Sequence, residues 1–371
     1  MSRGAGHAWT IQDVAQAAEV SVATVSRILN GNPTVNSELA IRVRSAIAET
    51  GYQPSRVARS LRRRTSATWA LVIPDVENSF FTAMVRGVED VAHASGSSVY
   101  LCNSDDDLNK ERRYLDVALS EQVAGIILAP ASEEESDLRV VRASGTPVVT
   151  VDRRVKDDTI DSVLVDNVDA SAAATKHLLE SGFRRIACIV GPHAATTSRE
   201  REQGYLRALG QFRGKAHDPI VMHTNFKYEG GYAAVGELAR SPDLPDALLL
   251  GNNLVALGAL ERLRDEPDAL PGHIGLLAFD DSPWFRLIRP SLSAVVQPTY
   301  EIGQVAGQLL RALIQGRSDP PAHRRLATRL ELRESSRRPS NPKVRCNDWD
   351  ADRRRRVDGG SAFSVTLLPQ P

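Results

Sequence analysis

The sequence contains few cysteines and no long hydrophobic run, and each of these absences excludes a class of protein. Its cysteines, Cys102, Cys188 and Cys346, are odd in number and far apart, so they suggest neither a disulfide framework nor a paired-cysteine metal site. We expect them to be reduced, with Cys102 and Cys188 in core strands. No apolar run approaches the ~20 residues of a membrane-spanning helix, and the first residues, MSRGAGHAWT, lack the apolar stretch of a signal peptide. We therefore expect a cytoplasmic protein without a membrane partner.

Motifs for catalysis and cofactor binding are also missing. The chain has no GxSxG nucleophile elbow, no GxxxxGK[ST] phosphate loop and no HExxH motif, and its histidines are scattered without a ligand spacing. Asp280 and Asp281 are adjacent on a predicted strand, where neighbouring side chains point to opposite faces, so they do not form a catalytic pair. We predict that the protein is not an enzyme and uses neither a cofactor nor a metal.

Charge is balanced over the whole chain but unevenly distributed. The 46 basic and 46 acidic residues cancel, yet residues 1–64 contain nine arginines against four acidic residues. A cluster of cations on a small module is typical of a protein that binds a polyanion, because the cations release counterions from a phosphate backbone. A merely solvated basic surface is the alternative interpretation, and the local geometry decides between the two.

Three short helical segments follow one another at the start of the chain. Thr10, Ser21 and Asn36 are residue types that cap helix starts, and Gly51 is typical of a helix end. Each segment repeats apolar residues on one face. These residues are Ile11, Val14, Ala15 and Ala18 in the first segment, Val25, Ile28 and Leu29 in the second, and Leu39, Val43, Ala46 and Ile47 in the third. A short link joins the first two segments, which predicts a helix-turn-helix.

The second of these helices leaves small and basic side chains on its outer face, namely Val22, Ala23, Ser26, Arg27 and Asn30. Small side chains allow a helix to enter the DNA major groove, which is about 12 Å wide. There an arginine can donate two hydrogen bonds to guanine, and an apolar side chain can contact a thymine methyl group. We therefore predict that this face meets the edges of DNA bases.

The same region resembles a known family. The stretches TIQDVAQAAEVSVATVSRILNG and VNSELAIRVRSAIAETGYQPSRVARSL closely resemble the DNA-binding headpiece of the LacI/GalR family of bacterial transcriptional repressors, and the resemblance continues to about residue 336. It implies that bases are read by Val22, Ala23 and Arg27 and that phosphates are held by Thr24, Ser26 and Asn30. Glu19 departs from the family, which usually has Gly or Asn in this turn. A positive φ at Glu19 would cost some stability.

The segment PSRVARSL, residues 54–61, resembles the hinge helix of that family, which is ordered only on operator DNA. It is too short to be a stable helix alone, and the resemblance implies that two copies pack together at the minor groove, with Ala58 and Leu61 against the bases. Leu61 would be the wedge that unstacks the central base pairs and kinks the duplex. A basic linker with an accidental leucine is the alternative.

After the linker RRRTSAT the pattern changes to alternating strands and helices. Short apolar runs recur as WALVIP, SVYLCN, GIILAP, PVVTVD, RIACIVG, DALLLG and IGLLAF. Between them lie stretches of helical periodicity, such as Phe81, Met84, Val85, Val88 and Ala92. The alternation is typical of an α/β, doubly wound fold in which helices cover both faces of a parallel sheet. Two such lobes, with the chain crossing back near residues 295–298, would resemble the periplasmic sugar-binding proteins, as the core of the family does.

Polar residues follow several predicted strands, where ligands bind in such folds. Our candidates for an effector site are Asn78, Phe80, Phe81, Asp152, Thr197, Arg201, Asn253 and Asp280, and Asp75, Arg153 and Asn252 also follow these strands. Arg201 matches an arginine that the family has one turn before Gly-Tyr or Gly-Phe. Aromatic rings stack on the apolar face of a sugar and forked polar groups bind its hydroxyls, so we predict a monosaccharide or polyol. A nucleoside is the alternative ligand, and helix capping or a core position is the alternative role for each residue.

The predicted organisation has four parts: a helix-turn-helix headpiece (1–53), a hinge helix and linker (54–67), a two-lobed effector-binding and dimerisation core (68–336) and a tail (337–371). LATRLELRESS predicts the final strand of the core. The tail is rich in Pro, Arg and Asp and has no sustained period, so we expect it to be disordered. It also lacks the leucine heptads of a tetramerising coiled coil, which favours a dimer.

These features together predict a homodimeric transcription regulator, a repressor that binds palindromic double-stranded operator DNA and responds to a small effector between the core lobes. A dimer presents one recognition helix to each half-site, which matches the two-fold symmetry of such DNA. A stand-alone sugar-binding protein without a DNA role is the alternative. It leaves the headpiece unexplained.

Overall fold

The computed structural model describes residues 9–29, 36–52, 66–214, 218–242, 244–266, 274–317 and 319–338. The chain divides between Ser66 and Ala67 into two compact units, which we call the headpiece and the core. Several predictions fall outside the described residues, namely those on Asn30, Ala58, Leu61, Cys346, the hinge at 54–61 and nearly all of the tail.

The described part of the headpiece contains the three predicted helices, α1 (Ile11–Ala17), α2 (Val22–Leu29) and α3 (Ser37–Thr50). The side chains of Thr10, Ser21 and Asn36 each accept a hydrogen bond from a backbone N–H of the turn that follows, as predicted. Gly51 ends α3 with a left-handed φ of 67°. The apolar faces of the helices meet in one cluster, formed by Val14, Ala15, Ala18, Val25, Val43 and Ala46.

The turn between α1 and α2 adopts the backbone conformation that the sequence predicted to be unfavourable. Glu19 has a φ of 52°, in the left-handed region that favours Gly or Asn. Arg42 of α3 supports the turn, because its Nη2 donates to the carbonyl oxygen of Ala18 at 2.6 Å and to Glu19 Oε2 at 3.2 Å. A contact from α3 therefore offsets part of the strain at Glu19.

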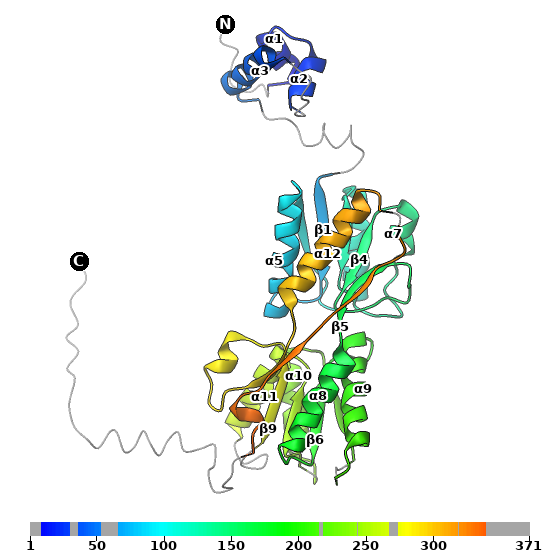
Figure 1. The fold of residues 1–371 in the computed structure, drawn as a ribbon, viewed down its shortest axis with the longest axis vertical. Coiled ribbons are helices and arrows are strands. Elements are labelled where there is room, and N and C mark those ends of the chain that lie inside the picture. Colours follow the sequence, from blue (N-terminus) through cyan, green and yellow to red (C-terminus); the bar gives the residue numbers. More distant parts are fainter. Residues whose placement is uncertain are drawn as a thin grey trace, which may run out of the picture. The chain divides into compact units, whose positions relative to one another are not determined.

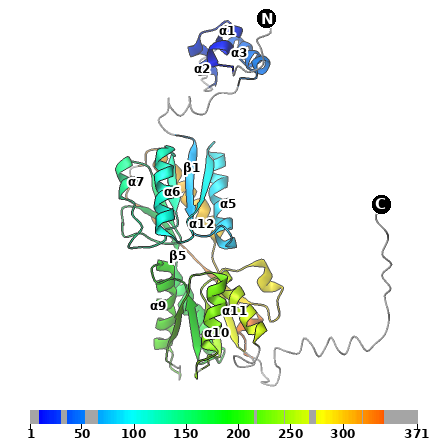
Figure 2. The ribbon, with the colours of Figure 1, turned by 180° about the vertical axis from the view of Figure 1, so that it is seen from behind.

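The first lobe of the core is built on a six-stranded sheet (Figures 1 and 2). Its strands are β1 (Thr68–Ile73), β2 (Ser98–Asn103), β3 (Gly125–Leu128), β4 (Val148–Val151), β5 (Asp161–Val165) and β11 (His323–Leu326). They pair in the order β11-β5-β4-β3-β1-β2, and every pair is parallel. Helices α5 (Ser79–Ala94) and α12 (Thr299–Ile314) pack on one face, and α6 (Leu108–Ser120) and α7 (Arg139–Ser144) on the other.

The second lobe repeats this architecture. Its strands are β6 (Ile186–Val190), β7 (Ile220–His223), β8 (Ala247–Leu250), β9 (Gly275–Phe279), β10 (Ser293–Val296) and β12 (Arg329–Glu331), in the order β12-β10-β9-β8-β6-β7. Only β12 runs antiparallel to its neighbour. One face is covered by α8 (Asn167–Glu180) and α9 (Thr196–Gln211), and the other by α10 (Tyr228–Leu238) and α11 (Asn253–Asp265). Two short 3₁₀ helices, η1 (Pro283–Arg286) and η2 (Glu334–Ser336), complete the lobe.

Within the described residues the chain crosses between the lobes after β5, after β10 and between β11 and β12. The predicted crossing at 295–298 is confirmed, because α12 packs in the first lobe directly after β10. The prediction of a final strand in LATRLELRESS is confirmed by β12, which lies within this segment. The segment starts at Leu326, the last residue of β11 in the first sheet, and continues into β12 of the second, and Figure 1 shows this part of the chain (orange) running from one lobe to the other.

Helices α5 and α12 approach each other closely through glycines. A Cβ atom on Gly87 would lie 2.2 Å from the carbonyl oxygen of Tyr300, and one on Gly303 would lie 2.1 Å from that of Met84. Both distances are far below van der Waals contact, so any larger residue would force the two helices apart.

The two described cysteines, Cys102 in β2 and Cys188 in β6, are buried as predicted. Desolvation raises the pKa of both thiols, so they remain protonated and unreactive. Among the described residues, no helix combines the length and the apolar character that crossing a bilayer would require.

Candidate functional site

The described residues that we predicted to contact DNA all lie on α2. Ala23 and Arg27 are exposed, and Thr24 and Ser26 are half-buried. Val22 departs from the prediction of an outward side chain, because it is half-buried and packs against the headpiece cluster. The exposed positions Ala23 and Arg27 lie about one helical turn apart on the same face.

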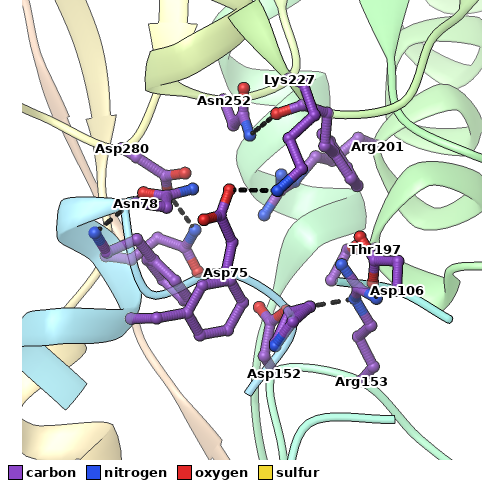
Figure 3. A pocket seen from close by; sticks show the side chains of 15 residues that line it. Asp75, Asn78, Asp106, Asp152, Arg153, Thr197, Arg201, Lys227, Asn252 and Asp280 are labelled. Carbon is purple, nitrogen blue, oxygen red and sulfur yellow. Dashed lines mark hydrogen bonds and ion pairs between the residues drawn. The ribbon is translucent and has the colours of Figure 1, made fainter. Parts of the chain in front are cut away.

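A small cavity lies between the two lobes of the core, at the carboxyl ends of strands from both sheets (Figure 3). The first lobe contributes Pro74, Asp75, Asn78, Phe80, Phe81, Asp106, Asp152 and Arg153, and the second contributes Thr197, Arg201, Phe226, Lys227, Asn252, Asp280 and Gln297. The volume of the cavity is about 30 Å³, which is space for very little beyond a water molecule. The lobes are therefore closed on each other.

All but one of the predicted effector-site residues line this cavity: Asn78, Phe80 and Phe81 at the start of α5, Asp152 after β4, Thr197 and Arg201 on α9, and Asp280 after β9. The exception is Asn253. Its Nδ2 donates to Ser79 Oγ of the first lobe at 2.9 Å and to Ser282 Oγ of the second at 3.3 Å. Asn253 therefore joins the lobes beside the cavity, and its neighbour Asn252 forms part of the wall.

Several cavity residues that follow strands have a left-handed backbone. The φ angle is 57° at Asp106, 64° at Asp152, 59° at Phe226 and 68° at Asp280. Aspartate tolerates this region better than most residues, which is one reason for the aspartates at these sharp turns. Strained backbone of this kind concentrates at ligand-binding sites.

Arg201 is a buried cation whose orientation is fixed by the second lobe. Its Nε donates to Asn167 Oδ1 at 3.0 Å, and its Nη1 donates to the carbonyl oxygen of Gly251 at 2.5 Å. The guanidinium also lies over the ring of Phe279, 4.2 Å from the centroid. Burial lowers the pKa of Arg201, and the charge of Asp280 opposes the shift. A guanidinium held in one plane is suited to binding two oxygen atoms of a ligand.

Arg153 is a second buried cation and belongs to the first lobe. It forms an ion pair with Asp106, its Nε lies 3.5 Å from Asp152 Oδ2, and its Nη1 donates to the carbonyl oxygen of Pro130 at 3.2 Å. Within the described residues its Nε has no hydrogen-bond partner. This N–H group is available to a ligand oxygen.

Burial also raises the pKa values of two carboxyl groups in the cavity. Desolvation raises the pKa of Asp280 to about 6, although the charge of Arg201 and a hydrogen bond from Gln297 oppose the rise. Desolvation likewise raises the pKa of Asp152. Gln297 Nε2 donates to Asp280 Oδ1 at 2.5 Å, while its Oε1 is buried with no partner in the part of the chain that the structure describes. An unpaired buried acceptor is unfavourable, so a ligand hydroxyl would stabilise this wall.

An ion pair spans the cavity from one lobe to the other. Lys227 Nζ, just before α10, lies 2.6 Å from Asp75 Oδ2, just after β1 (Figure 3). A second pair joins the lobes elsewhere, with Arg154 Nη2 3.7 Å from Glu200 Oε1. These contacts, together with those of Asn253, hold the lobes closed.

The sequence analysis did not name Asp106, Phe226, Lys227 and Gln297 as site residues. Each of them follows a strand, namely β2, β7 or β10. The rule that ligands bind at carboxyl ends of strands would have found Lys227 and Gln297 if β7 and β10 had been recognised. Strand β7 is only partly buried, so its sequence, IVMH, lacks the long apolar run of the central strands.

The cavity combines aromatic rings with buried carboxyl and guanidinium groups. Phe80 and Phe81 meet edge to face with their centroids 4.9 Å apart. The described residues contain no cluster of His, Cys, Asp and Glu side chains that could hold a metal ion. The arrangement suits a hydroxyl-rich ligand, because it offers paired donors and acceptors beside apolar ring faces.

Comparisons with known proteins match both units of the chain. The model of bacterial regulatory proteins of the lacI family matches residues 10–55, and that of the periplasmic binding protein-like domain matches residues 175–336. Catabolite control protein A of Priestia megaterium is 33% identical over 88% of this chain and 99% of its own length. The ribose operon repressor of Halalkalibacterium halodurans is 35% identical over 88% of this chain and 97% of its own length. The solved structure of a transcriptional regulator, the CelR–cellobiose complex, is 31% identical with a TM-score of 0.67 and covers 88% of this chain and 99% of its own.

Proposed function

The chain belongs to the LacI family of bacterial regulatory proteins, and on this premise we propose how its two units act. It is a DNA-binding transcription regulator. We infer a homodimeric repressor whose affinity for a palindromic operator is set by a small sugar bound between the lobes of the core. The observation that carries this proposal is the interlobe cavity, whose walls hold buried polar atoms that make no hydrogen bond to any residue that the structure describes.

The DNA contact is assigned to the outer face of α2. Arg27 and Ala23 are exposed there and read base edges, and the half-buried Thr24 and Ser26 hold phosphates. Asn30 and the hinge residues Ala58 and Leu61 keep their predicted roles, the last as the minor-groove wedge. Because the partner is chromosomal DNA, the protein acts in the cytoplasm.

The effector site is assigned to the cavity residues around Arg201 and Asp280. Phe81 supplies an apolar face for a sugar ring. Gln297 Oε1 supplies an acceptor and Arg153 Nε a donor, and neither atom makes a hydrogen bond within the described part of the chain. The named relatives support this ligand class, since one is a ribose operon repressor and another is a complex with cellobiose. We assign the site to binding alone and not to catalysis, because Arg153 pairs with Asp106 and Asp152 and Asp280 accepts a hydrogen bond from Gln297.

Effector binding and operator binding are linked thermodynamically. A ligand that prefers one arrangement of the lobes changes operator affinity by its differential affinity for the two states, typically about 1–3 kcal/mol. Operator DNA then changes effector affinity by the same factor. This reciprocity distinguishes a regulator from a sugar-binding protein that only carries a headpiece.

The test of base reading uses an operator selected from random duplex DNA and binding measured by fluorescence anisotropy. We expect Arg27→Ala to lose about 1–3 kcal/mol on the selected operator and to change little on random DNA. The matched control is Arg44→Ala, which removes one exposed charge from α3 of the same headpiece. An equal loss in both variants, or an equal loss on both DNAs, would contradict base reading by Arg27.

The test of the effector class is a thermal-shift screen of sugars, polyols and nucleosides, because a ligand of the native state raises the melting temperature. We expect a sugar to raise it and to change operator affinity. A shift with nucleosides alone would contradict the sugar assignment, and a ligand without effect on DNA binding would contradict the coupling.

A further inference from the structure

A large groove lies on the second lobe between α8 and α9, on their outer surface. Its volume is about 700 Å³, and its lining includes the small or apolar residues Ala172, Ala173, Leu179, Ala208 and Phe212. The lining residues of α9 lie toward its C-terminal end, whereas the effector cavity uses Thr197 and Arg201 near its start. We call this feature the α8–α9 groove. It is separate from the effector site.

Four of the five charged residues that line the groove pair with one another, and the fifth is Arg213. Asp169 Oδ1 lies 2.7 Å from Arg207 Nη2, and Glu180 Oε1 lies 3.6 Å from Lys176 Nζ. These pairs leave an apolar floor as the main surface for a partner. An uncharged apolar segment therefore fits the groove better than a charged one, because it gives up less hydration.

The chain leaves the described structure beside this groove. Arg338 Nη1 donates to the carbonyl oxygen of Gly182 at 2.5 Å, and its guanidinium lies 5.8 Å from the ring centroid of Phe183. Ser336 Oγ lies 2.9 Å from His177 Nε2 in the last turn of α8. Leu179, in that same turn, lines the groove. The tail therefore starts at the C-terminal end of α8, next to one end of the groove.

The tail ends in a segment with the required chemistry. Residues 359–371, GGSAFSVTLLPQP, contain no charged side chain. Phe363, Val365 and Leu367 alternate with Ser364 and Thr366, so an extended chain places the three apolar side chains on one side. This segment lies beyond residue 336, where the family match ends, and nothing in the proposed function uses it.

The segment is also within reach. Phe363 is 25 residues beyond Arg338, and a chain of that length can reach at most about 80–90 Å. Helix α8 has 14 residues and is about 21 Å long. A tether of this kind gives an effective concentration of the order of 1 mM at its own groove, which favours the chain's own tail over a free partner.

We propose that the segment Phe363–Leu368 binds in the α8–α9 groove of the same chain. Phe363, Val365 and Leu367 cover the apolar floor between the two helices, and the polar residues between them face solvent. The C-terminal segment is then an added part of the second lobe, and it shields a surface that the folded core leaves open.

The test measures hydrogen exchange of the backbone amides of α8 and α9 in the full-length protein. We compare the wild type with the double variant Phe363→Ser, Leu367→Ser, which leaves every described residue unchanged. We expect exchange in α8 and in the second half of α9 to become at least threefold faster in this variant. The matched control is Val344→Ser, which removes an apolar side chain from another part of the tail. Equal exchange in all three proteins would overturn the proposal.

A peptide of sequence GGSAFSVTLLPQP and a cross-linking experiment identify the occupant. The peptide should bind to the protein lacking residues 359–371 at least tenfold more tightly than to the full chain, because the full chain fills its own groove. A photoreactive benzoylphenylalanine in place of Phe363 should cross-link to α8 or α9 within one chain, in a mixture of heavy and light chains. Cross-links between chains, or equal peptide binding to both proteins, would overturn the assignment to the chain's own tail.

Discussion

Asp280 and Asp281 are neighbours in sequence but should respond in opposite ways to the same substitution. Asp280 is buried in the cavity wall, where it accepts a hydrogen bond from Gln297 and faces the charge of Arg201. Asp281 points elsewhere and forms a two-pronged ion pair with Arg333, whose Nη1 and Nη2 lie 2.8 and 2.7 Å from its two carboxylate oxygens. We predict that Asp280→Asn stabilises the core at neutral pH and that Asp281→Asn destabilises it.

The magnitude for Asp280 follows from its pKa. Desolvation raises this pKa from 3.8 to about 6, and each unit corresponds to about 1.4 kcal/mol of preference for the protonated form. The folded state therefore loses about 3 kcal/mol of stability as pH rises from below the unfolded pKa to above the folded one. Asparagine resembles the protonated acid, keeps the oxygen that accepts from Gln297 and tolerates the φ of 68°. Asp280→Asn should escape this loss.

The assay is urea unfolding of the core, followed by circular dichroism between about pH 4.5 and pH 8. The difference in free energy of unfolding between Asp280→Asn and the wild type should be about 1 kcal/mol at pH 4.5, which is already above the unfolded pKa of 3.8, and should approach about 3 kcal/mol above pH 7. The raised pKa values of Asp152 and Glu111 impose their own pH dependence on both proteins, so it largely cancels in the difference. Asp281→Asn should lose about 1.5–3 kcal/mol, as expected for a hydrogen-bonded charged pair.

One result would refute this reasoning. If Asp280→Asn were less stable than the wild type at pH 8, the carboxylate would be stabilised by Arg201 more than it is destabilised by burial. A difference that did not change with pH would equally show that the side chain is ionised in both states. Destabilisation by Asp281→Asn confirms that the assay responds to a lost ion pair at the adjacent position.

Further predictions concern packing, the headpiece turn and the effector. Gly87→Ala should lower the free energy of unfolding of the core by about 1–3 kcal/mol, because the new Cβ would overlap α12. Gly210→Ala should raise the free energy of unfolding by about 0.5–1 kcal/mol, because nothing lies within 4 Å of its Cβ. Glu19→Asn should raise the melting temperature of the headpiece in calorimetry. The stability gained by relieving the left-handed backbone strain at residue 19 should exceed the stability lost with the exposed ion pair between Glu19 and Arg42. Arg201→Lys keeps the charge but loses the planar fork, so the sugar found by screening should no longer shift the melting temperature.

The central strands and the helix caps could be predicted from the sequence because their signals are local. The runs WALVIP and IGLLAF belong to β1 and β9, which are almost wholly buried, so nearly every position is apolar. The strand β11 could not be recognised in this way. Its sequence, HRRL, is polar and largely exposed, and only its pairing with β5 makes it a strand.

The cavity was predictable only in part for a similar reason. The rule that ligands gather at strand ends placed Asp152 and Asp280 in its wall, but it does not say which of two adjacent residues faces inward. Asn252 lines the cavity and caps α11, whereas Asn253 turns toward Ser79 of the other lobe. That choice depends on the angle at which α11 begins, which the sequence does not encode locally.

The closed cavity constrains how any effector can bind. A volume of about 30 Å³ is an order of magnitude below the roughly 300 Å³ of the smallest ligand pockets, so a sugar cannot enter without separating the lobes. Separation requires the ion pair between Lys227 and Asp75 to part, and it frees carboxylate and ammonium groups that can bind the ligand's hydroxyls in turn. Because each crossing of the chain between the lobes is short, the lobes can rotate about these connections without unfolding. An effector that binds in this cavity therefore requires the lobes to move, and the free energy of breaking the Lys227–Asp75 contact becomes a part of its measured affinity.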